Sequence, residues 1–411
     1  KLNKVLEPLF RESLRSIAGY FDTLPSKKYN FLLYIKDVQS EVSAILDDPS
    51  FKSILEFGEK YPSAGALEHR NSSTYFLLDM GNIHEASLLS KFHYESMLKS
   101  VIIHEFMHIL TPLNIRTERI SNFDFQDPKM SKHLWLYEGV TEYFAGIMQL
   151  KSGQMKPENY LSGVLKEKIE LAQKFPYKKM SMTDMSENIL KRKYNKHYDQ
   201  VYYHGAILAL CLDFEIIKLT NGNKDLRRVL LDLLNQYNSD HPLKEEEMIS
   251  EIVNRVDPDL QIFFNKYVSG KEELLINHYL HYAGMRYFLY DQVYEPIPIV
   301  SRQYGISGIE DKVWKILING KIKISEVQNG SLFKVGDELD YFEYYNQIKN
   351  SEGSISVKDG ESVTLDVINN GKSRQVDLKI IFQSQTKTDI FRIDENIKDE
   401  KLNIRETWLS Y

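Results

Sequence analysis

The chain has 411 residues, a formal net charge of -6, 42% hydrophobic and 27% charged residues, which is typical of a globular protein with two or three domains. This net charge leaves no basic surplus to neutralise a phosphate backbone, which argues against nucleic acid as a partner. No apolar stretch approaches the roughly 20 residues of a membrane span. Cys211 is the single cysteine, so any metal would need nitrogen and oxygen ligands. The sequence begins at Lys1, without an initiator methionine or the apolar core of a signal peptide. We therefore expect this chain to be a processed or trimmed fragment.

The first 285 residues predict a small strand-bearing part followed by a helical part. Apolar spacing predicts a helix over 1–20, strands over 29–37 and 73–80, and a helix over 38–48. From residue 93 to about 282 the pattern is mostly helical, with several short helices after Pro242. The main helices are predicted over 93–110, 134–150, 157–174, 200–219 and 224–237.

The pattern changes after "YEPIPIVSRQYG" (294–305), where two prolines in an extended stretch predict an interdomain connection. Beyond it, short β-rich runs are separated by turn signals such as "NNGK" (369–372). We therefore predict an α+β fold with a domain over 1–290 and a β-rich domain over 295–385. The tail, 386–411, is predicted to contain a helix that docks through Trp408.

The run "SVIIHEFMHILTP" (100–112) contains two histidines four residues apart. Residues at this spacing lie on one helix face, so His104 and His108 can turn ring nitrogens toward one ion. Glu105 lies about 100° round the helix from His104, where it can accept a proton from a water at the metal. This HEXXH arrangement predicts a catalytic metal site. The alternative is two partly buried structural histidines.

The stretch "HLWLYEGVTEYFAG" (133–146) provides the third ligand that a catalytic zinc needs. We predict that this ligand is Glu138. Trp135 before it is expected to bury the helix, and Gly139 after it to allow close approach. Glu142, one turn further, is placed to accept a hydrogen bond from the second nitrogen of a ligating histidine. The alternative for both glutamates is a solvated surface carboxylate.

HEXXH followed by "WLYEG" resembles the thermolysin-like zinc peptidases whose third ligand is glutamate, and "WLYEGVTEYFA" is most similar to the glycyl aminopeptidase family. Upstream, "GALEHRNSST" (65–74) resembles the Gly, Ala, apolar, Glu, Asn motif of related aminopeptidases. Downstream, "YYHGAILALCLDFEI" (202–216) is similar to the family's Tyr, any residue, Lys, Gly, Ala segment, with His204 in place of the lysine. The resemblance covers about residues 10–285.

The resemblance implies roles for two further segments. Glu68 would bind the free α-amine of a substrate, and the backbone of Gly65 and Ala66 would pair with the peptide. The alternative for Glu68 is an edge-strand glutamate in a surface ion pair. Tyr202 would donate a hydrogen bond to the oxyanion, with Tyr203 as the fallback. The alternative for both tyrosines is a place in the helical core.

In the β-rich domain, "VQNGSLFKVGDEL" (327–339) resembles part of a PDZ domain, a module that would bind a peptide carboxylate near "YGISGIE" (304–310). The alternative is a small β-domain that packs against the catalytic part. Together the resemblances imply a thermolysin-like catalytic domain followed by a PDZ-like domain.

The activity implied is that of an aminopeptidase with one Zn²⁺ per chain, held by His104, His108 and Glu138, with a peptide substrate and a preference for a first Gly or Ala. Two alternatives remain: a zinc endopeptidase, and a catalytically silent protein that binds peptides through its PDZ-like domain. The presence of all three ligands and of the candidate base Glu105 argues against the silent protein. The family favours a bacterial cell envelope or periplasm, with the cytoplasm as the alternative.

Overall fold

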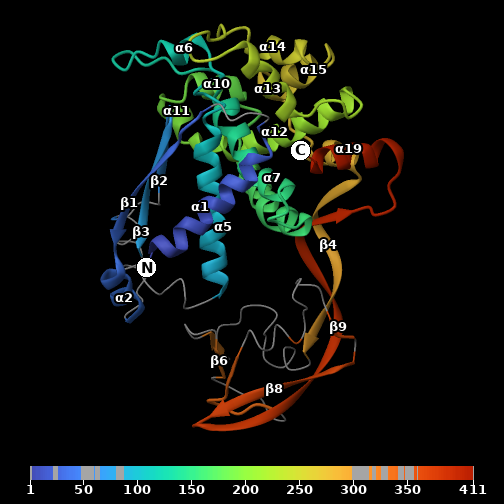
Figure 1. Cartoon of the computed structure of the whole chain (residues 1–411). Helices are drawn as coiled ribbons and strands as arrows, with labels where there is room; N and C mark the ends of the chain where they lie inside the picture. The colour runs from blue at the N-terminus through green and yellow to red at the C-terminus, as the bar shows by residue number, and fades with distance from the viewer. Residues whose placement is uncertain are drawn as a thin grey trace. The chain divides into compact units, whose positions relative to one another are not determined.

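The computed structural model describes residues 2–21, 26–47, 60, 65–79, 88–298, 314–316, 321–324, 332–340, 347, 356–358 and 360–410. The chain contains both helices and strands and divides into two compact units (Figure 1). Unit 1 comprises residues 1–80, 95–288 and 389–411, and unit 2 comprises residues 81–94 and 289–388. The β-rich unit is therefore inserted in the chain before the last helix of unit 1.

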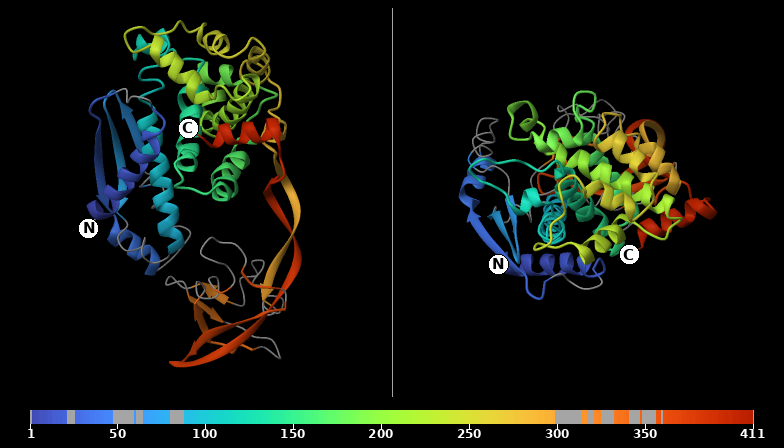
Figure 2. Two further views of the ribbon diagram at one scale, coloured as in Figure 1. Left: turned by 45° about the vertical axis from the view of Figure 1, so that its right-hand side comes forward. Right: turned by 90° about the horizontal axis from the view of Figure 1, so that it is seen from above.

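A three-stranded sheet forms one part of unit 1. Its strands are β1 (Asn30–Asp37), β2 (Gly65–His69) and β3 (Ser72–Asp79), in the order β1-β3-β2, with β3 parallel to β1 and antiparallel to β2. Helices α1 (Leu2–Ala18) and α5 (Leu88–Met107) lie beside this sheet (Figure 2), and α2 (Gln39–Asp47) follows β1. The rings of Phe10 on α1 and Phe106 on α5 lie 4.9 and 6.5 Å from Phe31 on β1. This aromatic cluster fixes α5 against the sheet.

The rest of unit 1 is helical. Its elements are α6 (Glu118–Ser121), η1 (Trp135–Val140), α7 (Thr141–Lys151), α8 (Pro157–Asn159), η2 (Tyr160–Leu165), α9 (Lys166–Ala172), α10 (Met182–Glu187), α11 (Arg192–Asn195), η3 (Tyr198–Val201), α12 (Tyr203–Leu219), α13 (Leu226–Gln236), α14 (Met248–Asn254), α15 (Leu260–Phe263), η4 (Phe264–Val268), α16 (Ile276–Leu280) and η5 (His281–Ala283).

The middle of helix α12 is fully buried, because residues 208–212 are each 0% exposed. A helix that is apolar all round is one that neighbours surround. Within the described part of the chain, no helix has the length and apolar character needed to cross a membrane.

Three predicted helices change type along their length. The predicted helix 134–150 begins with the π-helical turn η1 and continues as α7, and the predicted helix 200–219 begins with the 3-10 turn η3 before α12. The predicted helix 157–174 consists of α8, the π-helical segment η2 and α9. Apolar spacing could not show these changes, because one extra or missing residue per turn barely alters the pattern. π-helical turns inside helices are frequent at functional sites, and η1 carries Glu138.

Unit 2 contains a six-stranded sheet in the order β4-β9-β8-β7-β6-β5. The strands are β4 (Met285–Pro298), β5 (Trp314–Ile316), β6 (Lys321–Ile324), β7 (Glu338–Asp340), β8 (Ser362–Asn369) and β9 (Lys372–Ile393), and the pairs from β5 to β9 are antiparallel. Asn370 and Gly371 join β8 to β9 with φ angles of 48° and 77°, as a two-residue hairpin turn requires. The "NNGK" turn is thereby confirmed.

The "GDEL" stretch of unit 2 has a local structural reason. Gly336 has φ 86°, a conformation that favours glycine. The side chain of Asp337 is 0% exposed and accepts hydrogen bonds from the backbone of Lys334 at 2.7 Å and the side chain of Asn369 at 2.8 Å, beside an ion pair with Arg374. The segment therefore forms a fixed turn before β7.

The predicted connection 294–305 was partly wrong, because residues 294–298 form the end of β4. β4 is an edge strand, where a proline does not interrupt a ladder of hydrogen bonds on both sides. The remaining residues of that stretch, and the "YGISGIE" segment, lie outside the described residues.

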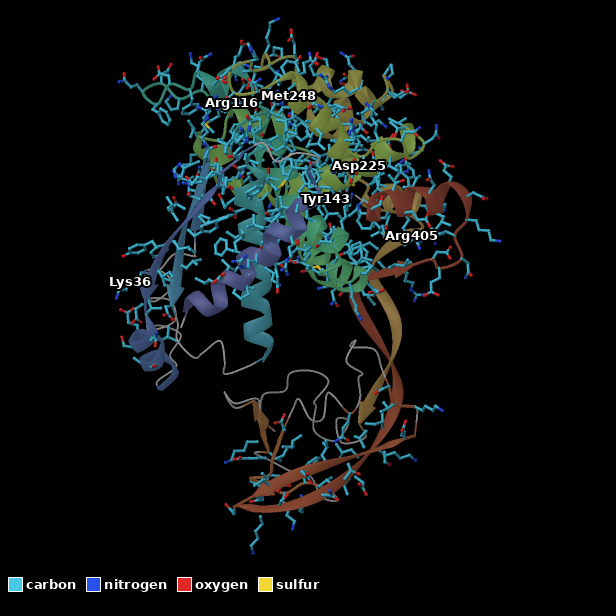
Figure 3. All side chains as sticks on the ribbon, viewed as in Figure 1. Lys36, Arg116, Tyr143, Asp225, Met248 and Arg405 are labelled. Carbon is cyan, nitrogen blue, oxygen red and sulfur yellow. The ribbon has the colours of Figure 1, made fainter. Side chains whose placement is uncertain are left out.

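The C-terminal segment differs from the predicted tail in where it begins. Strand β9 continues to Ile393, past the predicted boundary at 386, and the helix α19 (Asp399–Leu409) follows. Trp408 is 2% exposed in the core of unit 1, and its Nε1 donates to the Tyr143 hydroxyl at 2.9 Å. Arg405 donates to the carbonyls of Ala283 and Gly284 at 2.8 and 3.1 Å. Figure 3 labels Tyr143 and Arg405.

Candidate active site

The two histidines of the HEXXH motif lie at the end of α5 and are almost fully buried, with exposures of 7% for His104 and 2% for His108. His104 Nδ1 lies 2.8 Å from a carboxylate oxygen of Glu142, and His108 Nδ1 lies 2.8 Å from the carbonyl oxygen of Thr111. Both oxygens accept, so each Nδ1 carries the hydrogen. In the neutral form of each ring, the lone pair is therefore on Nε2. A histidine that binds a metal through Nε2 needs this tautomer, which the acceptor at Nδ1 stabilises.

Glu138 is brought to these two nitrogens by η1. Its Oε2 lies 3.4 Å from His104 Nε2 and 3.5 Å from His108 Nε2. Ligand atoms about 2.0–2.1 Å from a tetrahedral zinc are separated by roughly 3.4 Å, since the edge of a tetrahedron is about 1.6 times the distance from its centre to a corner. The three side chains therefore have the donor types and the spacing of a site for one small metal ion.

The carboxylates around the His104 ring favour a positive charge at this place. Burial disfavours a charged His104, but its hydrogen bonds with Glu138 and Glu142 outweigh that effect and raise its pKa to about 10. Burial also opposes ionisation of Glu142, yet the charge of Lys168 and the contact with His104 lower its pKa to about 2. Lys168, on α9, forms an ion pair with Glu142 Oε1. The sequence alone does not point to this lysine, because no spacing connects it to the motif.

Glu105, the candidate base, is 7% exposed, and its buried Oε2 contacts no hydrogen-bond partner among the described groups. Burial raises its pKa to about 7; the charge of His104 opposes the rise, and the charges of Glu68 and Glu138 add to it. A carboxylate oxygen that is buried without a partner costs free energy unless a water or a ligand meets it. Glu105 is thus placed and tuned to exchange a proton near neutral pH.

Glu68 approaches the same place from the sheet. It lies on β2 opposite Ser73 of β3 and is partly buried. The ligand atoms of Glu68, Glu105 and His108 all lie within 4.8 Å of one another. Gly65 and Ala66 are also on β2, which is an edge strand in the described sheet, so its outer side can pair with an extended peptide.

Tyr202 lies at the start of α12 with its ring 5.8 Å from the His104 ring. Burial and the nearby Glu138 raise the pKa of its hydroxyl well above 10, so it remains a donor at neutral pH. Burial and the charge of Asp199 raise the pKa of Tyr203. His204 is buried and stacked on Phe175 at 4.4 Å, and burial lowers its pKa to about 4. The residue at the lysine position of the family motif is therefore a neutral core side chain.

Two glycines explain why the motifs "EG" and "HGA" come together. A Cβ atom placed on Gly139 would lie 2.5 Å from the Gly205 Cα, and one on Gly205 would lie 2.8 Å from the Gly139 Cα. The backbones of η1 and α12 are therefore in direct contact. We expected Gly139 to allow close approach to the site; the approach is to Gly205. This contact holds the element that carries Glu138 against the one that begins after Tyr202.

Comparison with known proteins agrees with this geometry. Residues 97–208 match the model of the M61 glycyl aminopeptidase family. The chain is a peptidase in which this segment is similar to that family. The matched segment contains His104, Glu105, His108, Glu138 and Tyr202. The resemblance found in the sequence is thereby confirmed over this segment, which does not include Glu68.

A solved structure has a similar fold. The crystal structure of an aminopeptidase N family protein from Idiomarina loihiensis superimposes with a TM-score of 0.56 at 15% sequence identity, over 100% of this peptidase and 67% of that chain. At this identity the likeness shows the fold alone. A search of curated proteins gave no match.

Proposed function

We propose that this peptidase is a zinc aminopeptidase of the M61 type whose unit 1 has a thermolysin-like catalytic fold. One Zn²⁺ would be held by the Nε2 atoms of His104 and His108 and by Glu138. The spacing of these donors and the absence of a thiolate support zinc with nitrogen and oxygen ligands. When bound, zinc would polarise the scissile carbonyl and lower the pKa of a water toward roughly 7.

The side chains then divide the remaining work. Glu105 takes a proton from the attacking water and passes it to the leaving amine, a role that suits its pKa of about 7. Tyr202 donates its hydroxyl hydrogen to the carbonyl oxygen as negative charge develops there. Glu142 and the Thr111 carbonyl hold the two imidazoles in the required tautomer.

The observation that carries the aminopeptidase proposal is the position of Glu68, whose carboxylate lies close to Glu105 and His108. An ionised carboxylate one residue away from the reacting carbonyl can pair with a substrate α-ammonium and so measure the distance to the first peptide bond. The edge strand β2 would align the peptide through Gly65 and Ala66. An endopeptidase has no need of such a carboxylate.

The test compares a peptide with a free amino terminus and the same peptide after N-acetylation. The wild type is expected to cleave the free peptide far faster. Leaving either partner of a buried charge pair unpaired costs about 2 to 4 kcal/mol, so Glu68→Gln should lower kcat/KM on the free peptide roughly 30-fold to 1000-fold. Activity on the acetylated peptide should barely change.

A matched control is Glu158→Gln, which makes the same change of charge on the exposed helix α8 and should leave both rates unaltered. Equal wild-type rates on the free and blocked peptides would end the aminopeptidase proposal and leave an endopeptidase. No cleavage of either peptide by the zinc-loaded wild type would argue for a protein that binds peptides without cleaving them, whereas full activity of Glu105→Gln would remove Glu105 as the base.

The preference for a small first residue, Gly or Ala, is supported by the family resemblance and by the side chains beside Glu68. Leu67 is 56% exposed, and His69 is also exposed. A bulky first side chain would press on these neighbours. A series of aminoacyl amides from glycine to phenylalanine tests this preference. The expected result is that kcat/KM falls as the first side chain becomes larger.

We also propose that unit 2 is a PDZ-like domain. Its antiparallel sheet, its own small core around Leu365 and Val367, and the fixed "GDEL" turn support a separate β-domain of this type. Titration of the whole chain with peptides that end in a free or an amidated carboxylate tests whether it captures peptide tails.

A further inference from the structure

A second tyrosine lies beside the one that we assign to the oxyanion. Tyr198 begins the turn η3 and lies one helical turn before Tyr202. Their ring centroids are 5.7 Å apart at an interplanar angle of 72°, and their hydroxyl oxygens are 3.2 Å apart. Tyr198 is 38% exposed, whereas Tyr202 is half-buried, with its ring 5.8 Å from the buried His104 ring.

The hydrogen bond between the two hydroxyls can run in either direction, and the direction matters for catalysis. A phenol hydroxyl has one hydrogen. If Tyr202 donated to Tyr198, that hydrogen would not be available to a substrate oxygen. If Tyr198 donates, the Tyr202 oxygen is occupied as an acceptor and its own hydrogen is free to point elsewhere.

Negative charge on a substrate oxygen decides between the two directions, because a hydrogen bond to a charged acceptor is roughly twice as strong as one between neutral groups. Tyr202 therefore donates to the oxyanion, and Tyr198 donates into the oxygen of Tyr202. A donor in this second position also polarises the first hydroxyl, since hydrogen bonds in series strengthen one another by about 10–30%.

We propose that Tyr198 is a positioning residue, which directs the hydroxyl hydrogen of Tyr202 toward the substrate oxyanion by donating a hydrogen bond to the Tyr202 oxygen. This inference rests on the role that the proposed function gives to Tyr202. The sequence carries a signal for it, because residues 198 and 202 have the spacing of one helix face. Sequence analysis considered the adjacent Tyr203 and not the residue one turn away.

The test is a double-mutant cycle on the whole chain with a free-amine substrate, using phenylalanine so that each ring keeps its packing. Tyr202→Phe is expected to lower kcat roughly 100-fold or more. Tyr198→Phe should lower kcat roughly 3-fold to 10-fold with little change in KM, since it removes one neutral hydrogen bond that acts in the transition state. In the Tyr202→Phe background, Tyr198→Phe should have no further effect.

The control is Tyr194→Phe, one turn before Tyr198, where the ring packs against the core. This variant should leave kcat and KM within about twofold of the wild type, because removing one surface hydroxyl away from the site changes the protein's stability very little. Melting temperatures of all variants are measured, because a drop shared by Tyr198→Phe and Tyr194→Phe would reflect packing.

Each other outcome has one meaning. If Tyr202→Phe is impaired and Tyr198→Phe is fully active, the positioning role is wrong while the proposed function stands. If the two losses multiply in the double variant, or if Tyr198→Phe raises KM and leaves kcat unchanged, Tyr198 acts on the substrate independently and the inference is overturned. If Tyr202→Phe is fully active, the assignment of the oxyanion donor is itself wrong.

Discussion

Replacing Gly139 by alanine should separate the two elements that carry the candidate catalytic groups. The added Cβ would lie 2.5 Å from the Gly205 Cα, 2.6 Å from its carbonyl carbon and 2.8 Å from the Val201 oxygen, all of them backbone atoms. Carbon atoms prefer separations of roughly 3.5 Å or more. Because no flexible side chain can yield, η1 and α12 must move apart by about 1 Å.

This displacement has two measurable effects. Overpacking of this kind destabilises a protein by about 1 to 3 kcal/mol, which should lower its melting temperature. A misplacement of about 1 Å between catalytic groups can cost roughly 100-fold in rate, so kcat/KM should fall by about 10-fold to 100-fold. The loss of activity is therefore expected to exceed what the unfolded fraction at the assay temperature explains.

The assay measures the melting curve and kcat/KM of Gly139→Ala beside two other variants. Gly205→Ala, on the other side of the same contact, should behave similarly. Gly163→Ala is the control, because no atom lies within 4 Å of the added Cβ, and alanine in a helix should be neutral or stabilising by up to about 1 kcal/mol. If Gly139→Ala matches Gly163→Ala in both measurements, the backbone contact does not set the geometry of the site.

Three further predictions concern the metal, the pH dependence of stability and the last helix. Glu138→Ala should lose metal, because it removes one of three proposed protein ligands, whereas Glu105→Gln should keep the metal and lose nearly all turnover. Metal analysis of both variants tests this prediction. Full metal content in Glu138→Ala would remove that residue from the ligand set. The free energy of unfolding should decrease as the pH falls from about 6.5 to 4. Burial lowers the pKa of His204 in the folded state to about 4, whereas the same histidine titrates near 6.5 in the unfolded chain. The unfolded chain therefore binds the proton first and is stabilised relative to the folded chain. Urea titrations at pH 7 and pH 4 should show a loss larger by up to about 3 kcal/mol in the wild type than in His204→Gln, and equal losses would contradict this. Trp408→Ala should destabilise unit 1 by about 3 to 5 kcal/mol, because this 2% exposed ring fills the core and donates to Tyr143; an unchanged melting temperature would contradict it.

Local patterns in the sequence were enough to predict elements whose residues interact with near neighbours. The strand 29–37 and the hairpin turn at Asn370 are examples, since alternation and turn chemistry are local. The π-helical turn at Trp135–Val140 could not be predicted in this way, because packing against Gly205 accompanies it and that contact joins distant segments. The end of β9 at Ile393 likewise depends on pairing within the sheet.

The candidate site shows the same division. His104 and His108 could be paired from spacing alone, because one helix presents both. Glu138 was predicted because a catalytic zinc needs a third ligand and the next helix offers one. Glu68 needed a family resemblance, since it comes from a strand and a lone glutamate carries no signal of its partner. Lys168 contacts the site only through Glu142, 26 residues away along the chain, and it became visible only with the fold.

The charges of the site also favour a substrate with a free amino terminus. Four carboxylates gather there, those of Glu68, Glu105, Glu138 and Glu142, and Lys168 compensates one of them through its ion pair with Glu142. With neutral imidazoles and Glu105 in its ionised form, a bound dication would compensate two more and leave one negative charge. Unpaired charges of one sign in a partly dry site repel strongly, because the dielectric screening is weak. A substrate α-ammonium makes the site neutral, whereas an N-acetylated peptide leaves a carboxylate without a partner. Glu68 is one of the carboxylates in this count, so its charge and its position on β2 favour the same class of substrate.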